Sequence, residues 1–141
     1  ADAMTEKGYK PVFFGDEGDE EFVKEAVSYM KHTPLIATGA FSVGELAVAL
    51  RHCDLLITND SGPMYVAISQ NVPVVALYGP SSTKLYGPYT PNAIAVTAQP
   101  PCLGCAGSMK HKCDDMQCMN RITVEQVVEA ALKMLNGEGN S

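Results

Sequence analysis

The sequence predicts an α/β fold of the Rossmann type, a parallel β-sheet with helices on both faces. Apolar runs alternate with helical patterns along the chain. The runs are continuous rather than alternating with polar residues, which is typical of strands that are buried on both faces of a parallel sheet. Small polar residues follow two of the runs directly, as they do at the carboxyl ends of parallel strands. We therefore expect a single sheet with ligand-binding loops at its carboxyl edge.

The elements follow in order along the chain. The predicted strands are short apolar runs at 11–15, 34–38, 54–58, 73–79 and 93–97. Helical patterns cover 1–7, 19–30, 42–52, 63–70 and 123–137, with a turn or short helix at 82–86. The spacings of Ser42 to Glu45 and of Thr123 to Gln126 suit capping boxes, and glycines suit the ends of the first and last helices. Residues 99–121 are expected to be irregular.

The chain begins within a helical pattern, whereas a fold of this type begins with a strand. In the common strand order 3-2-1-4-5-6 the first strand is central. We therefore expect residues 1–7 to be the helix that follows this strand, and the chain to be a piece of a longer polypeptide without its first strand. The 141 residues themselves fit one domain.

Composition excludes some classes of function. The net charge is −6, and both nucleic acids and membrane surfaces need a basic face. No apolar run reaches the roughly 18 residues of a transmembrane helix, and no signal-peptide pattern opens the chain. We expect a cytoplasmic protein without a transmembrane segment and without a nucleic-acid partner.

Two loops carry the chemistry that a nucleotide would need. Asp60-Ser61-Gly62-Pro63 follows one strand, and Gly79-Pro80-Ser81-Ser82 follows the next. Pro63 suits a first helical turn, Asp60 or Ser61 is expected to cap it, and Gly62 allows close approach of a ligand. Helix-start amides bind anions. Each loop alone also fits an ordinary cap or turn, but adjacent strand ends favour a diphosphate site.

This region resembles a known family. The stretch TNDSGPMYVAISQNVPVVALYGPSS, residues 58–82, is similar to the signature of glycosyltransferase family 9, D-[ST]-G-x-x-H-x-x-A followed by PvvaLfGPt. The resemblance extends from about residue 8 to residue 128. It implies a two-domain GT-B enzyme of which residues 1–141 form the C-terminal, sugar-nucleotide-binding domain. Family members transfer a heptose from an ADP-heptose-type donor to the lipopolysaccharide core.

The resemblance also implies donor-binding residues. Asp60, Ser61 and Gly62 match the donor-binding positions of the family signature. Tyr65 stands where the family usually has His, so a possible cation is replaced by a group that can only form hydrogen bonds. An ordinary helix aromatic fits Tyr65 equally well. Gly79 and Ser81, in the second loop, complete this part of the expected donor site.

Two further donor contacts are implied earlier in the chain. Phe41 falls where the family meets the nucleobase through backbone atoms, and Asp19 matches an acidic position near the donor ribose. Each has a structural alternative. Phe41 fits hydrophobic packing at a helix start, and Asp19 lies in an acidic run that a helix dipole stabilises anyway.

The family's catalytic base, acceptor site and further phosphate contacts match no residue of this chain. The resemblance therefore implies an N-terminal acceptor-binding domain of the same protein and a lipopolysaccharide core acceptor. It implies a bacterial enzyme, peripheral to the inner membrane through that domain. No cofactor is required, since backbone dipoles can stabilise a leaving diphosphate. We expect the chain alone to bind donor but to transfer nothing; the alternatives are a non-catalytic nucleotide- or anion-binding module and a metal-stapled interaction domain.

Four of the five cysteines form a Cys-rich segment at 102–118, before the last helix. Cys102, Cys105, Cys113 and Cys118 have the ligand count of a structural zinc site. Reduced thiols fit equally well, and disulfides less well. Cys53 is expected to be a buried free thiol. Tyr78, Tyr86 and Tyr89 crowd around the second loop, where they could line a sugar pocket or a domain interface.

Overall fold

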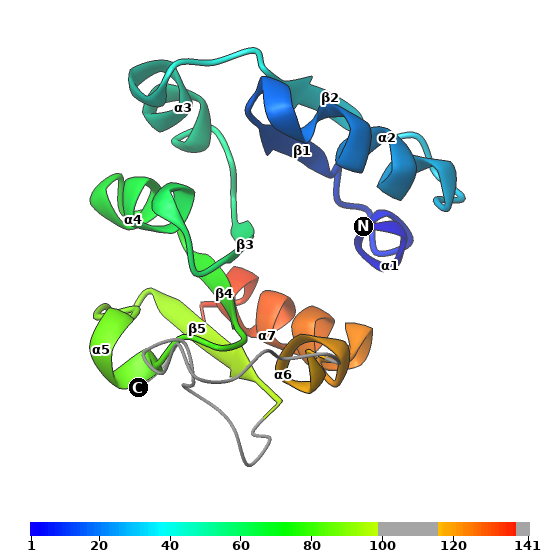
Figure 1. The fold of residues 1–141 in the computed structure, drawn as a ribbon. Helices are drawn as coiled ribbons and strands as arrows, with labels where there is room; N and C mark the ends of the chain where they lie inside the picture. The colour runs from blue at the N-terminus through cyan, green and yellow to red at the C-terminus, as the bar shows by residue number, and fades with distance from the viewer. Residues whose placement is uncertain (99–115, 138–141) are drawn as a thin grey trace. The chain divides into compact units, whose positions relative to one another are not determined.

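A computed structural model describes residues 1–98 and 116–137. It confirms the α/β class and the order of the predicted elements (Figure 1). Strands β1 (Val12–Gly15) and β2 (Leu35–Thr38) form one parallel sheet. Strands β3 (Leu56–Asn59), β4 (Val74–Tyr78) and β5 (Ala93–Thr97) form another, also parallel.

The strands therefore form two hydrogen-bonded sheets where the sequence predicted one. Within the described residues β1 pairs only with β2, and β3 pairs only with β4, so each has a neighbour on one side alone. In the strand order expected from the sequence, the missing first strand would stand between β1 and β3, and in the described residues β1 and β3 do not pair with each other. The further central strand expected from the sequence stays a prediction.

The chain divides into two compact units, Ala1–Leu46 and Ala47–Ser141, and each is described by itself. The first unit holds the β1–β2 sheet and the helices α1 (Asp2–Thr5), η1 (Glu17–Asp19) and α2 (Glu20–Ser28). The Asp2 carboxylate accepts hydrogen bonds from the amides of Lys31 and His32, at 2.9 and 3.0 Å. It thereby ties α1 to the turn that precedes β2.

Both predicted capping boxes are present. Helix α3 (Val43–Leu50), which crosses the division between the units, begins where the Ser42 amide donates to the Glu45 carboxylate at 2.8 Å. Helix α7 (Val124–Leu135) begins where the Thr123 amide donates to the Gln126 side chain at 2.9 Å. The sequence could predict both capping boxes because the two partners of each lie within one helical turn.

The core of the second unit lies around β4. Helix α4 (Gly62–Ser69) packs on β3 and β4, and α7 packs on β4 and β5. Figure 1 shows these two helices on opposite sides of β4. The largest fully buried side chains are Tyr78, Leu50, Met64, Val74 and Val75. β4 is thus the one described strand that meets the expectation of two buried faces.

The expectation that each strand is buried on both faces is wrong for the edge strands. Leu35 and Ile36 of β2 are 62% and 55% exposed, and Ile57 of β3 is also exposed. An apolar run shows that a strand can be covered, but the covering elements must come from elsewhere in the fold. Within the described residues Leu35 and Ile36 each stay more than half exposed.

The irregular region predicted at 99–121 also needs correction. Residues 99–115 lie outside the described residues, but α6 (Gln117–Asn120) is a short helix that lies near β4. It follows Met116, whose φ of 43° places it in the left-handed region. A single helical turn without a cap or an apolar period gives almost no sequence signal.

Candidate functional site

The two glycine-containing loops leave the same edge of the second sheet. β3 and β4 are parallel, with Asn59 in register with Leu77. The Asp60 amide continues the pairing past the end of β3 by donating to the Leu77 carbonyl at 3.2 Å. Loop 60–62 and loop 79–82 therefore begin side by side at the carboxyl ends of adjacent strands, as the sequence predicted. Ligands of open α/β sheets bind at this edge.

The start of α4 is arranged differently from the expected cap. Ser61 precedes the helix, but its side chain does not cap it. The Ser61 hydroxyl turns back toward the strand, donating to the Asn59 carbonyl at 3.2 Å and lying 3.4 Å from the Thr58 hydroxyl. The expectation that Asp60 or Ser61 caps α4 through its side chain is therefore wrong, because the Ser61 hydroxyl finds closer partners at the strand end.

Few amides remain for an anion at this helix start. Pro63 has no amide hydrogen, and the Met64 amide donates to the Ser61 carbonyl at 3.1 Å. Within the described part of the chain the amides of Ser61 and Gly62 have no hydrogen-bond partner. Because α4 has no side-chain cap, these two amides and the helix dipole are the groups that can receive a negatively charged oxygen.

The two glycines of the loops have different surroundings. A Cβ placed on the exposed Gly62 would meet no atom within 4 Å. A Cβ placed on the buried Gly79 would lie 2.5 Å from Sδ of Met119 and 3.5 Å from Sγ of Cys118. Gly62 therefore leaves open space in front of α4, whereas Gly79 leaves room for α6. The second contact shows that Gly79 is needed for packing, whether or not it also meets a ligand.

Tyr65 makes a hydrogen bond within the protein. Its hydroxyl, on the first turn of α4, donates to the Tyr86 carbonyl at 2.8 Å, and its side chain is 45% exposed. The Tyr78 hydroxyl lies 3.2 Å from the same carbonyl. Burial, and then the negative charge of Asp60, raise the pKa of both tyrosines, so both hydroxyls keep their protons near neutral pH. The hydrogen of Tyr65 is therefore engaged by the chain itself.

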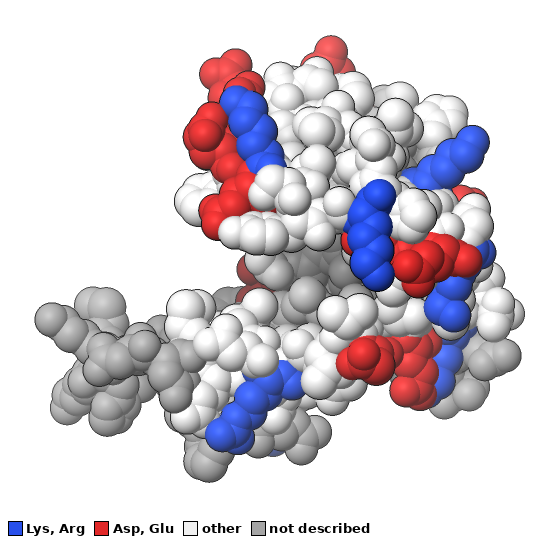
Figure 2. Space-filling model, turned by 90° about the vertical axis from the view of Figure 1, so that its right-hand side faces the viewer, with Lys and Arg blue, Asp and Glu red and all other residues white. Residues whose placement is uncertain are grey.

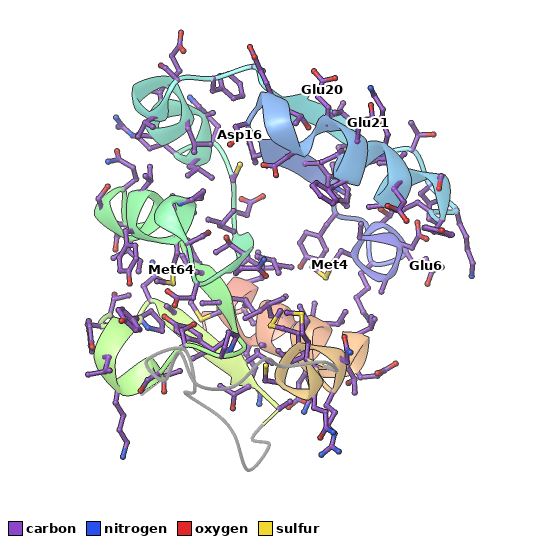
Figure 3. All side chains as sticks on the ribbon, viewed as in Figure 1. Met4, Glu6, Asp16, Glu20, Glu21 and Met64 are labelled. Carbon is purple, nitrogen blue, oxygen red and sulfur yellow. The ribbon has the colours of Figure 1, made fainter. Side chains whose placement is uncertain are left out.

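Met64 holds the other side of α4 in the core. Its side chain points from α4 toward the sheet (Figure 3), and its Sδ lies 3.5 Å from the Tyr78 hydroxyl. It is fully buried, as is Tyr78. Because α4 is anchored on this side, its first turn and the loop in front of it have a defined position relative to the end of β4.

The first unit carries the other two predicted donor contacts. β1 and β2 are in register from Val12 with Leu35 to Gly15 with Thr38, so the loops that follow them also share an edge. The Asp19 carboxylate accepts from the Asp16 amide at 3.1 Å, in a capping box at the start of η1. The acidic side chains of this run, among them Asp16, Glu20 and Glu21, come from η1, α2 and the residue before them (Figure 3).

Phe41 packs against a neighbouring strand residue. Its ring lies 6.0 Å from that of Phe14, with the ring planes at 42°. The alternative given for Phe41, hydrophobic packing, is present, and the acidic run around Asp19 lies at the starts of η1 and α2 as its alternative requires. The capping contact of Asp19 is an additional finding. Donor contacts by these residues stay predictions, as do those of the second unit.

Sequence reasoning missed two groups near the loops. The Tyr86 carbonyl accepts two tyrosine hydroxyls, and Met119 fills the space beside Gly79. The crowding of tyrosines around the second loop was the only available signal for the first group. No local pattern could place α6 beside Gly79.

The cysteine prediction lies mostly outside the described residues. Cys102, Cys105 and Cys113 are not described, and Cys118 is buried on α6. Residues 1–98 and 116–137 hold no group of His, Cys, Asp or Glu side chains arranged to bind a metal. Cys53 is half-buried rather than buried, and its Sγ donates to the Ala49 carbonyl at 3.7 Å. The zinc and thiol alternatives both stay predictions.

The surface bears on the class of partner. On the face shown in Figure 2, most Lys and Arg side chains lie next to Asp or Glu side chains, so charges of both signs are mixed there. None of the helices in the described part is long and apolar enough to cross a membrane.

Parallel strands that alternate with helices place the chain in the α/β class, whose ligands bind at the carboxyl ends of the strands. Comparison with known proteins makes this more specific. A model of glycosyltransferase family 9 (heptosyltransferase) matches residues 1–114, and the chain therefore belongs to this family.

Curated relatives cover the chain but are much longer. Lipopolysaccharide heptosyltransferase 2 of Escherichia coli is 32% identical over 97 residues, covering 66% of this chain and 28% of that protein. Lipopolysaccharide heptosyltransferase 2 of Salmonella typhimurium is 28% identical over an alignment that covers 99% of this chain and 41% of that protein. The chain thus spans at most about two fifths of these relatives.

Solved structures of glycosyltransferases also resemble this chain. A glycosyltransferase family 9 protein from Veillonella parvula matches with a TM-score of 0.82 and 44% identity, over 97% of this chain and 39% of that one. The ADP-heptose lipopolysaccharide heptosyltransferase II of E. coli matches with a TM-score of 0.78 and 26% identity, over 96% of this chain and 39% of that one.

Proposed function

We propose that this chain is the donor-nucleotide-binding domain of a heptosyltransferase-like glycosyltransferase, a longer protein that also has an acceptor-binding domain. The complete enzyme would transfer a sugar from an ADP-heptose-type donor to a lipopolysaccharide core acceptor at the cytoplasmic side of the inner membrane. The proposal is supported by family membership and by the share of the relatives that the chain spans.

The observation that carries the proposal is the start of α4. Ser61 and Gly62 have amides without partners in the described residues, and Gly62 faces open space. Loop 79–82 begins beside them at the end of β4. We assign the donor diphosphate to these two amides, with the Ser81 side chain contributing from the neighbouring loop. The amides would stabilise the negative charge that develops on the departing diphosphate, without a metal.

The other donor contacts follow the family positions. Asp60 lies two residues before the first residue of α4, Asp19 is the last residue of η1, which follows β1, and Phe41 lies in the loop that follows β2. We assign the ribose to Asp19 and the nucleobase to backbone atoms around Phe41. The Asp19 carboxylate uses Oδ2 for the Asp16 amide, so Oδ1 remains for a ribose hydroxyl.

Substitution of Gly62 tests the assignment. Gly62→Ala adds a methyl group where the fold has space but the donor phosphate would lie. We expect an unchanged unfolding midpoint and an affinity for ADP, measured by calorimetry, that falls about five-fold or more, the equivalent of one lost hydrogen bond. Gly44→Ala is the matched control, since a Cβ there also meets nothing within 4 Å. Unchanged ADP affinity in Gly62→Ala would refute the phosphate assignment.

One observation favours a second candidate, a non-catalytic nucleotide- or anion-binding module. Tyr65 replaces the usual His of the family, and its hydroxyl is bound to Tyr86 rather than turned to a ligand. Two measurements separate the candidates. Calorimetry with ADP, UDP and their sugars tests for donor binding, and a transfer assay tests the protein joined to its acceptor-binding domain. We expect transfer by the joined protein and none by the 141-residue chain alone.

A further inference from the structure

One backbone oxygen receives two tyrosine hydroxyls from different elements. The Tyr86 carbonyl lies 2.8 Å from the hydroxyl of Tyr65 on α4 and 3.2 Å from that of Tyr78 on β4. A carbonyl oxygen has two lone pairs, so both hydroxyls can bind at once. Tyr78 is fully buried, and its position is fixed by the core. Tyr65 is the partly exposed member of the pair.

Tyr86 is the last residue of α5 (Thr83–Tyr86). Carbonyls at the end of a helix have no partner within the helix and need one elsewhere. The tyrosines supply it, because Tyr89 also donates its hydroxyl to the Lys84 carbonyl at 2.8 Å. Ser82, before the helix, gives no side-chain cap. The one-turn helix is therefore held mainly from its carboxyl end.

The loop that carries Gly79 and Ser81 runs between β4 and α5, so its path is bounded by a strand and by this short helix. The strand end is fixed by the core. The α5 end is held by Tyr78 and Tyr89, and by Tyr65, which reaches across from the first turn of α4. The same side chain thus connects the helix that follows loop 60–62 to the helix that follows loop 79–82.

We propose that Tyr65 is a positioning residue that sets the distance between the two donor-binding loops by holding the carboxyl end of α5 against the start of α4. It does not contact the diphosphate through its hydroxyl hydrogen, which is already donated. This inference rests on the proposed donor-binding function. It assigns to a tyrosine a mechanical role at the position where a cationic ligand side chain is usual in the family.

Tyr65→Phe removes the hydroxyl and keeps the ring. Hydrogen exchange reports on the tie directly through the amides of Leu85, Tyr86 and Gly87, which bond to the carbonyls of Ser82 and Thr83. We expect these amides to exchange about five-fold faster in the variant, the effect of losing one net hydrogen bond. Amides of β4 are expected to be unchanged. Tyr29→Phe is the control, because Tyr29 is exposed and its hydroxyl has no partner in the described residues.

ADP affinity distinguishes positioning from mere structure and from direct contact. In Tyr65→Phe we expect a dissociation constant for ADP that is raised about two- to five-fold, with an unfolding midpoint that falls by no more than the loss of one net hydrogen bond explains. Faster exchange with unchanged affinity would reduce Tyr65 to a structural residue and overturn the proposal. Weaker affinity without faster exchange would make Tyr65 a ligand and also overturn it.

Failure of the two proposals can be told apart. If the wild-type chain does not bind ADP, the proposed function fails, and with it the role of Tyr65 in donor binding. Exchange of the α5 amides still decides whether the tie itself exists. Unchanged exchange in Tyr65→Phe would then refute the tie independently of any nucleotide.

Discussion

Met119 occupies the space that a side chain at Gly79 would need, with Sδ 2.5 Å from the position of a Cβ. Gly79 is the first residue after β4 and begins loop 79–82, and Met119 belongs to α6, forty residues later. Packing against α6 therefore requires a glycine at this position, whether or not the rest of loop 79–82 binds a ligand.

Gly79→Ala is expected to destabilise the chain by about 1–3 kcal/mol, the usual range for overpacking, because Met119 must leave its place. Urea denaturation measures this free energy of unfolding. In a Met119→Ala background the same substitution is expected to cost clearly less, since the space has been vacated. Equal costs in both backgrounds would show that the two residues are not coupled.

The starts of α4 and α7 are expected to respond differently to loss of a hydroxyl. Thr123 caps α7 by accepting from the Gln126 amide at 3.3 Å, whereas Ser61 does not cap α4. Thr123→Ala is expected to cost about 1 kcal/mol of unfolding free energy. Ser61→Ala is expected to cost less than half of that. A larger loss in Ser61→Ala than in Thr123→Ala, measured by urea denaturation, would contradict the observed hydrogen bonds.

Asp2 predicts a pH dependence in the first unit. The hydrogen bonds from the amides of Lys31, and then of His32, lower the pKa of Asp2 below its ordinary value of 3.8. A lowered pKa in the folded state adds stability above the unfolded-state value, and this contribution is lost as the pH falls through the folded-state value. Asp2→Asn should therefore be less stable than wild type at neutral pH, with the difference shrinking under acid.

Denaturant midpoints measured from about pH 7 down to about pH 3 test this dependence. Glu25→Gln is the control, because Glu25 is exposed and its carboxylate has no partner in the described residues. A gap between Asp2→Asn and wild type that stays constant across this range would show that the carboxylate charge is not the cause.

Cys53 should react slowly with alkylating agents. Burial, and then the nearby charge of Asp54, raise the pKa of its thiol, so less thiolate is present at neutral pH than in an unperturbed cysteine. Peptide mapping after iodoacetamide treatment gives the rate at this residue. Asp54→Asn removes the second cause and is expected to accelerate the reaction. No acceleration would leave burial as the sole cause.

The sequence predicted the fold class and the order of elements because strong local signals mark them. Apolar runs, two capping boxes and glycines such as Gly8 and Gly137 at helix ends all act within a few residues. The division into two sheets and the exposure of Leu35 and Ile36 depend on which strands pair and what covers them. Those are properties of the whole fold, which local patterns do not contain.

The candidate site likewise combines features that local patterns predict with features that they do not predict. Loops 60–62 and 79–82 were predicted to share an edge, and the β3–β4 register places them there, because parallel strands present their carboxyl ends together. The fate of each side chain was not predictable. Ser61 turns to Asn59 instead of capping, and Tyr65 turns to Tyr86. Which partner a hydroxyl binds depends on its distances to the nearby acceptors. These distances follow from tertiary structure alone.

Strand pairing in this chain follows the order of synthesis. β2 pairs with β1, β4 with β3 and β5 with β4, each with its immediate predecessor. As the polypeptide leaves the ribosome, β2, β4 and β5 each emerge after a strand with which they pair. The template for each new strand is already available when its own last residue emerges, so the β3–β5 sheet can grow vectorially during translation. Tyr65 is likewise made before Tyr86, so the start of α4 can be in place when α5 first folds against it.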